Sequence, residues 1–180
     1  MFEGWENFYL MIGSSAAALI GLMFVVMTLT AGRDRGEVDQ GKRLYTSPIV
    51  WHLAVVMALS GAATAPMINL RLFGTAAGGL AILGLGIGIR SAVGIWRTRM
   101  SGADSAFDMW WYGLVPAIVY VGLAVASLGI FGAAKWGAST FAAALMALLL
   151  LSIHAEWDLV TFLAPRASPP PDSSAGKKKR

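Results

Sequence analysis

The chain has 180 residues, of which 57% are hydrophobic and only 13% are charged, and its formal net charge is +4. A typical soluble domain has about 25% charged residues, so this composition, with a mean hydropathy of +0.65, excludes an ordinary soluble domain and indicates a polytopic α-helical membrane protein. The absence of cysteine excludes a disulfide framework, a Cys-ligated metal site and covalent c-type haem attachment.

Five apolar segments are each long enough to cross a hydrocarbon core of about 30 Å, which takes roughly 20 residues. The first is preceded by no Lys or Arg, so it predicts a retained span rather than a cleaved signal peptide. We therefore expect an all-α bundle of five transmembrane helices over residues 1–166. The expected spans are about 8–31, 48–68, 73–96, 109–133 and 138–163.

Three prolines mark the expected helices. Ser47-Pro48 is a typical helix start, with a capping hydroxyl followed by a proline in the first turn. Pro66 falls in the last turn of the expected second span and Pro116 in the second turn of the fourth. Both are expected to bend or loosen their helices, which neighbouring helices tolerate in a membrane bundle.

The basic residues are divided unequally between the two sides of a five-span topology. One side receives only Arg71 and Lys135. By the positive-inside rule, this predicts an N-terminus outside and a C-terminus in the cytoplasm. The cytoplasmic side receives Arg33, Arg35, Lys42, Arg43, Arg97, Arg99, Arg166, Lys177, Lys178, Lys179 and Arg180.

The C-terminal segment, residues 167–180, reads "ASPPPDSSAGKKKR" and is expected to be a disordered basic cytoplasmic tail. Near an anionic leaflet, each of Lys177, Lys178, Lys179 and Arg180 adds about 1 kcal/mol of attraction. The tail is therefore either a lipid-binding segment or only a topology determinant, and the sequence leaves both interpretations open.

Small residues recur at intervals of four along three of the expected spans. Such stripes let helix backbones approach closely in lipid, either within one chain or between subunits. The stripes are Gly13, Ala17 and Gly21; Gly74 and Gly78; Gly84, Gly88 and Ala92; and Gly122 and Ala126.

Five polar residues are expected at a similar depth on the cytoplasmic side: His52, Arg90, His154, Glu156 and Asp158. His154 and Asp158 share a helix face at i, i+4, whereas Glu156 points roughly opposite. Arg90 is expected to neutralise either Glu156 or Asp158.

This polar layer has several interpretations. It is a proton or ion relay, or it binds b-type haem through His52 and His154. A divalent metal on His52, His154 and Asp158 would lack any recognised ligand spacing, and we assign no metal. Alternatively, "HAEWD" simply occupies the headgroup zone, because Ala138–Ile153 already covers about 24 Å of helix.

The opening "WENFYLMIGSSAAALIGLMFVVMTL" and the late "AEWDLVTFLA" resemble small multi-span bacterial membrane proteins of no assigned activity. The resemblance covers the first span and part of the last. It implies a bacterial inner-membrane location and transfers no catalytic residues.

The longest expected loop has about 15 residues, which leaves no soluble domain to hold an active site. We therefore expect a non-enzymatic membrane protein, an oligomeric or accessory subunit whose partners are the lipid bilayer and a second copy or another membrane subunit, and not nucleic acid. The alternatives are a small channel or transporter that uses the polar layer, and a haem-binding redox protein.

Overall fold

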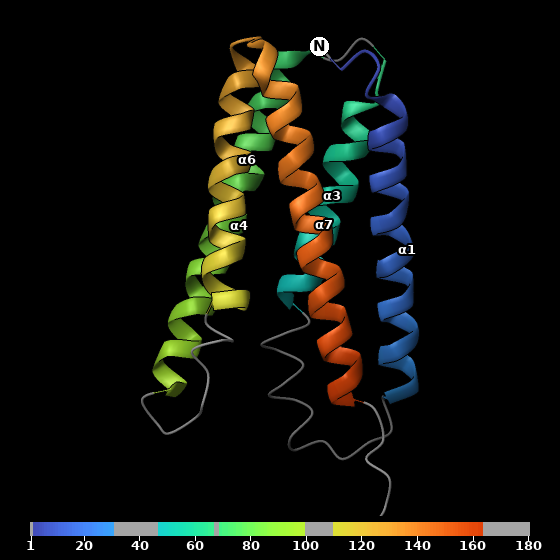
Figure 1. Ribbon diagram of the computed structural model, residues 1–180, viewed down its shortest axis with the longest axis vertical. Helices are drawn as coiled ribbons and strands as arrows, with labels where there is room; N and C mark the ends of the chain where they lie inside the picture. The colour runs from blue at the N-terminus through green and yellow to red at the C-terminus, as the bar shows by residue number, and fades with distance from the viewer. Residues whose placement is uncertain (1, 31–46, 67–68, 100–109, 164–180) are drawn as a thin grey trace, which may run out of the picture.

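The computed structural model describes residues 2–30, 47–66, 69–99 and 110–163, and these residues form a helical bundle without a β-strand. Consecutive helices run alternately down and up the long axis (Figure 1). A helix occupies each of the five apolar segments. The elements are α1 (Glu6–Thr30), α3 (Ser47–Ala63), α4 (Leu70–Arg99), the π-helical turn η2 (Trp110–Leu114), α6 (Val115–Phe131) and α7 (Lys135–Leu163).

The bundle is built from two helix pairs joined through α7. Helix α4 packs along α6 and α1 packs along α3, while α7 contacts α6, α3 and α1 (Figure 1). The buried interior contains large apolar side chains from these helices, including Ile12, Leu53, Leu123 and Leu145. Helix α3 also contacts α4, so α3 and α7 each touch three other helices.

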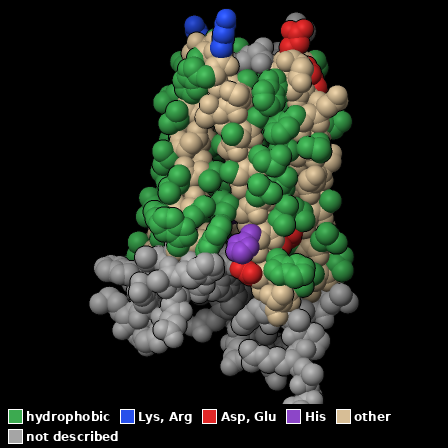
Figure 2. All heavy atoms as spheres, in the orientation of Figure 1, with side chains coloured by type: hydrophobic (Ala, Val, Ile, Leu, Met, Phe, Trp, Pro, Cys, Tyr) green, Lys and Arg blue, Asp and Glu red, His purple; other side chains and the backbone are tan. Residues whose placement is uncertain are grey.

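The outer surface of the bundle is apolar as well. Leu10 and Phe24 on α1, Ile82 on α4, Leu128 on α6 and Leu150 on α7 all point outward. Hydrophobic side chains cover most of the face shown in Figure 2, with charged side chains toward its two ends. An apolar exterior of this kind suits a hydrocarbon environment and not water.

Three of the helices are long and apolar enough to cross a membrane. They are the segments Glu6–Thr28, Leu70–Val93 and Lys135–Thr161, whereas Pro48–Ala63 and Val115–Phe131 are shorter apolar helices. The described structure therefore has the length, composition and exterior of a membrane-embedded helical bundle.

An aromatic cluster closes the bundle at the N-terminal end. Gly4 has a φ of +80°, a conformation that a residue without Cβ adopts readily, and the chain turns there. Buried Phe2 lies with its ring centroid 5.5 Å from that of Tyr9, 5.3 Å from Phe73 and 6.0 Å from Phe141. Edge-to-face contacts at these distances are favourable, so this cluster joins α1, α4 and α7.

The two expected small-residue stripes on α4 lie against α6 and the η2 turn that precedes it. A Cβ on Gly74 would lie 3.0 Å from the backbone of Ser127 and Phe131, and one on Gly78 would lie 3.0 Å from the Ser127 hydroxyl oxygen. Gly84 and Gly88 are also buried on this interface. Ala92 meets Gly113 of η2 at its other end. Both stripes therefore serve packing inside one chain.

The stripe on α1 behaves differently along its length. Gly13 contacts Ser60 of α3, whereas Ala17 is exposed and Gly21 is exposed with nothing within 4 Å of an added Cβ. A step of four residues advances about 40° around a helix of 3.6 residues per turn. The stripe therefore turns away from α3 and faces outward by Gly21.

The short stripe on α6 is divided in the same way. Ala126 is buried, but Gly122 has nothing within 4 Å of an added Cβ. Gly122 therefore makes no close helix approach within the described residues.

Two prolines set helix ends. Helix α3 stops at Ala63, before Pro66, so the second apolar helix is shorter than the expected range of 48–68. The Pro66 ring would collide with the carbonyl of residue 62 in a continued helix, and Ala65 N instead bonds to Ala62 O at 3.2 Å. Pro116 lies in the first turn of α6, where a missing N–H is tolerated, and the wider η2 turn precedes it.

The basic tail of residues 167–180, with Lys177, Lys178, Lys179 and Arg180, lies outside the described residues. So does the basic loop that contains Arg33, Arg35, Lys42 and Arg43.

Candidate functional site

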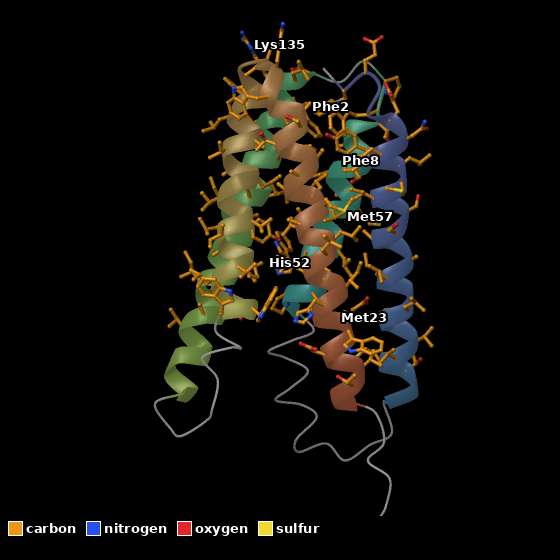
Figure 3. The ribbon with its side chains drawn as sticks, viewed as in Figure 1. Phe2, Phe8, Met23, His52, Met57 and Lys135 are labelled. Carbon is orange, nitrogen blue, oxygen red and sulfur yellow. The ribbon has the colours of Figure 1, made fainter. Side chains whose placement is uncertain are left out.

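A buried polar pair joins α3 to α6. The side chain of His52, 5% exposed, hydrogen-bonds through Nδ1 to the hydroxyl of fully buried Tyr120, with 2.7 Å between the two heavy atoms. The ring centroids lie 5.4 Å apart at an interplanar angle of 48°. Figure 3 shows His52 inside the bundle, nearer its middle than Met23. A polar group at such a position stabilises the bundle only when it has a partner.

The third helix at this junction is α4. A Cβ on Gly84 would overlap Cε1 and Cζ of Tyr120, so the Tyr120 ring occupies the space that a side chain would need. The neighbouring Trp51 has a buried indole Nε1 that makes no well-aligned hydrogen bond. Gly84 thus permits the ring position from which Tyr120 reaches His52.

A second polar pair lies on the surface of α7. His154 Nε2 and Asp158 Oδ2 are 3.6 Å apart, as the i, i+4 spacing predicts, and the two side chains are 41% and 42% exposed. The Trp111 ring of η2 lies beside them, with its centroid 4.9 Å from that of His154. In Figure 2 a histidine contacts a carboxylate on the face of the bundle. An exposed pair of this kind contributes little to stability.

Glu156 lies on a different face of α7 from this pair. It lines an apolar groove between α1 and α7, together with Met23 and Trp157. Its Oε1 atom is buried and has no hydrogen-bond partner in the structure. The opposite orientation of Glu156 agrees with its position two residues from both His154 and Asp158.

Arg90 is exposed on α4. Among the described residues it forms no ion pair with Glu156 or Asp158, the two partners expected from their similar depth. The five candidate residues therefore occupy four separate environments, and only His154 and Asp158 are brought together.

Two partners of these residues are absent from the candidates taken from the sequence. Tyr120 and Trp111 contact His52 and His154 respectively. A tyrosine in the middle of an apolar helix is a signal in itself, because its buried hydroxyl needs a partner. Nothing in the spacing of Trp111 indicates a contact with α7.

The chemistry that these groups support is limited. No group of three His, Asp or Glu side chains suited to a metal ion occurs in the part of the chain that the structure describes. His52 is held by Tyr120, and the His154–Asp158 pair has neither a nucleophile nor an oxyanion-stabilising group among its contacts given above. The arrangement supports helix packing, proton exchange at exposed groups and ligand binding in the groove.

No protein-family model, no curated protein and no solved structure matches this chain.

Replacing Tyr120 with phenylalanine is expected to lower the free energy of unfolding by about 1 kcal/mol, because buried His52 loses its partner. Reversible unfolding in mixed micelles, followed by tryptophan fluorescence, measures the change. The double variant with His52→Leu is expected to lose less than the sum of the two single variants. Additive losses would show that the hydrogen bond contributes no coupling.

Proposed function

We propose that this protein is a five-span protein of the bacterial cytoplasmic membrane, with its N-terminus outside and its C-terminus in the cytoplasm. The alternating helix directions support this topology (Figure 1). The 17-residue helix α3 is about 26 Å long, which is close to a hydrocarbon core of about 30 Å. Helix α6 also has 17 residues, and the five residues of η2 extend it at its N-terminal end.

Within that topology, we infer a non-enzymatic role as a membrane subunit that associates with a second copy through α1. The observation that carries this proposal is the outward position of Ala17 and Gly21. On α4 the comparable glycines are covered by α6, but no helix of the described structure lies within 4 Å of a Cβ added at Gly21. Small residues four apart allow two helices to approach closely in lipid.

The rest of that α1 surface is compatible with a helix contact. The hydroxyl of Ser14 donates to the Leu10 carbonyl at 2.6 Å, and that of Thr28 donates to the Val25 carbonyl at 2.8 Å. Both hydroxyls therefore donate a hydrogen bond within their own helix, and burying them against a second helix leaves no donor without an acceptor.

Single-cysteine crosslinking tests the proposal, because the chain contains no cysteine of its own. Oxidation of Gly21→Cys in native membranes is expected to give a product of twice the monomer mass in high yield. Gly79→Cys on α4 and Gly122→Cys on α6, also without neighbours within 4 Å, are the matched controls and are expected to give little product.

Equal yields at all three positions, or no product at Gly21, would overturn the proposal. A product of a different mass at Gly21 would overturn self-association and identify another membrane subunit as the partner.

The other functions have less support. A relay through all five polar residues requires them to be neighbours, yet His52, Arg90, Glu156 and the His154–Asp158 pair have different surroundings. A b-type haem between His52 and His154 would compete with the Tyr120 hydrogen bond at one imidazole and with Asp158 at the other.

A further inference from the structure

An apolar groove lies between the lower halves of α1 and α7, on the side of α7 away from the His154–Asp158 pair. Its volume is about 330 Å³, which lies at the lower end of the range of small-molecule sites. Leu19, Leu22 and Val26 line it from α1, and so does buried Met23. Figure 3 shows Met23 between the two helices.

Glu156 is the only ionisable residue that lines this groove among the described residues. Its Oε1 atom is buried without a hydrogen-bond partner, and the other lining residues are apolar or aromatic. A carboxylate in such surroundings is costly unless an opposite charge or a donor accompanies it. The protein supplies neither within the described structure, so the groove is complementary to a ligand that brings a positive charge.

We propose that this groove binds a lipophilic cation, an organic amine or onium ion whose apolar groups fill the space between α1 and α7 while its charge pairs with Glu156. Trp157 lies beside Glu156 in the same groove, and an indole ring attracts a cation over its face. A lipid acyl chain would fill the volume but leave the carboxyl group without a partner. A metal ion would find a single ligand here.

Binding of the cation is coupled to the ionisation of Glu156. A protonated carboxyl group that pairs with an onium ion releases its proton to water and becomes the carboxylate. Higher pH therefore strengthens binding, and lower pH weakens it. Among the described residues no other titratable group lines the groove. His154 and Asp158 lie on the other face of α7, and His52 of α3 is bonded to Tyr120. The α1 residues that line the groove are all apolar.

Equilibrium dialysis of the full chain in mild detergent, with tetraphenylphosphonium as the probe, tests this inference. We expect saturable binding that weakens as the pH falls through the range in which the Glu156 carboxylate takes up a proton. Glu156→Gln, which keeps the size of the side chain, is expected to bind at least tenfold more weakly and without pH dependence. Asp158→Asn, two residues away on the other face, is the matched control and is expected to bind like the unaltered chain.

Tetraphenylborate has nearly the shape of the probe with the opposite charge, and it is expected not to bind saturably. Equally tight binding of tetraphenylborate would overturn the inference and identify the groove as a general apolar site of the kind that an acyl chain occupies. Absence of saturable phosphonium binding, or equal binding by Glu156→Gln, would overturn it as well. Leu22→Trp enlarges a side chain that lines the groove and leaves the charge of Glu156 in place, so it is expected to weaken phosphonium binding as Glu156→Gln does. Unchanged binding by Leu22→Trp would show that the cation binds outside the groove and would overturn the inference.

Discussion

Replacing Gly84 with alanine is expected to lower the free energy of unfolding by about 3 kcal/mol, because overpacking a filled interface costs about that much. The added methyl group would overlap the Tyr120 ring at Cε1 and Cζ. Tyr120 is fully buried, and its hydroxyl is bonded to His52. Relief of the clash therefore requires either that α4 separate from α6 or that the hydroxyl of Tyr120 leave His52.

The matched control is Gly86→Ala on the same helix, where nothing lies within 4 Å of an added Cβ. That variant is expected to be as stable as the unaltered chain or up to about 1 kcal/mol more stable, because alanine favours a helix over glycine. Unfolding in mixed micelles, followed by far-ultraviolet circular dichroism, compares the two. Equal stability of the two variants would contradict the packing described for Tyr120.

The positions of the helices follow from the sequence because a membrane helix needs a continuous apolar run of predictable length. A helix occupies each of the five apolar segments. The helix ends were less predictable. Helix α3 ends at Ala63 because the Pro66 ring would collide with the carbonyl of residue 62 in a continued helix. Helix α4 extends to Arg99, beyond the apolar run that ends near residue 96.

The glycine pattern was predictable only in part. Spacing pairs Gly74 with Gly78 and Gly84 with Gly88, and both pairs do meet another helix. Spacing does not say whether a neighbour is present, and Gly21 and Gly122 have none within 4 Å. The neighbour depends on how each helix is rotated about its axis, which is set by packing across the whole bundle.

The same limit applies to the polar residues. Their positions along the helices follow from the order of the chain, and the facing of His154 and Asp158 follows from their i, i+4 spacing. The contacts between helices do not follow. Arg90 points outward from α4, whereas Tyr120, absent from the candidates, supplies the partner of His52. Local spacing predicts neighbours within one helix, and the rotation of a second helix determines the rest.

The connection between α6 and α7 brings two glycines together that have no regular spacing. Gly129 lies three residues before Gly132, the residue that follows α6, and Gly137 lies in the first turn of α7. The turn is held by hydrogen bonds from Ala134 N to Gly129 O at 2.8 Å and from Ala133 N to Ile130 O at 3.0 Å. These bonds fix the first turn of α7 against the last turn of α6.

Replacing Gly137 with alanine is therefore expected to lower the free energy of unfolding by about 3 kcal/mol, comparable to the Gly84 variant. The added Cβ would lie 2.8 Å from the Gly129 carbonyl carbon and 2.9 Å from Ile130 N. These are backbone atoms, so no rotamer change relieves the clash and the two helices must move apart.

Gly132→Ala in the same turn is the control for Gly137→Ala. Its Cβ would lie 3.5 Å from the Leu128 carbonyl oxygen and 4.0 Å from that of Gly129, both ordinary contacts, and its φ of −83° suits alanine. That variant is expected to stay within about 1 kcal/mol of the unaltered chain. Thermal unfolding in detergent, followed by the helical circular dichroism signal, ranks the two variants. Equal stability of Gly137→Ala and Gly132→Ala would contradict this packing. The backbones of α6 and α7 would then have to lie farther apart at Gly129 than described. Side-chain contacts, and not the close approach of Gly129 and Gly137, would stabilise the junction.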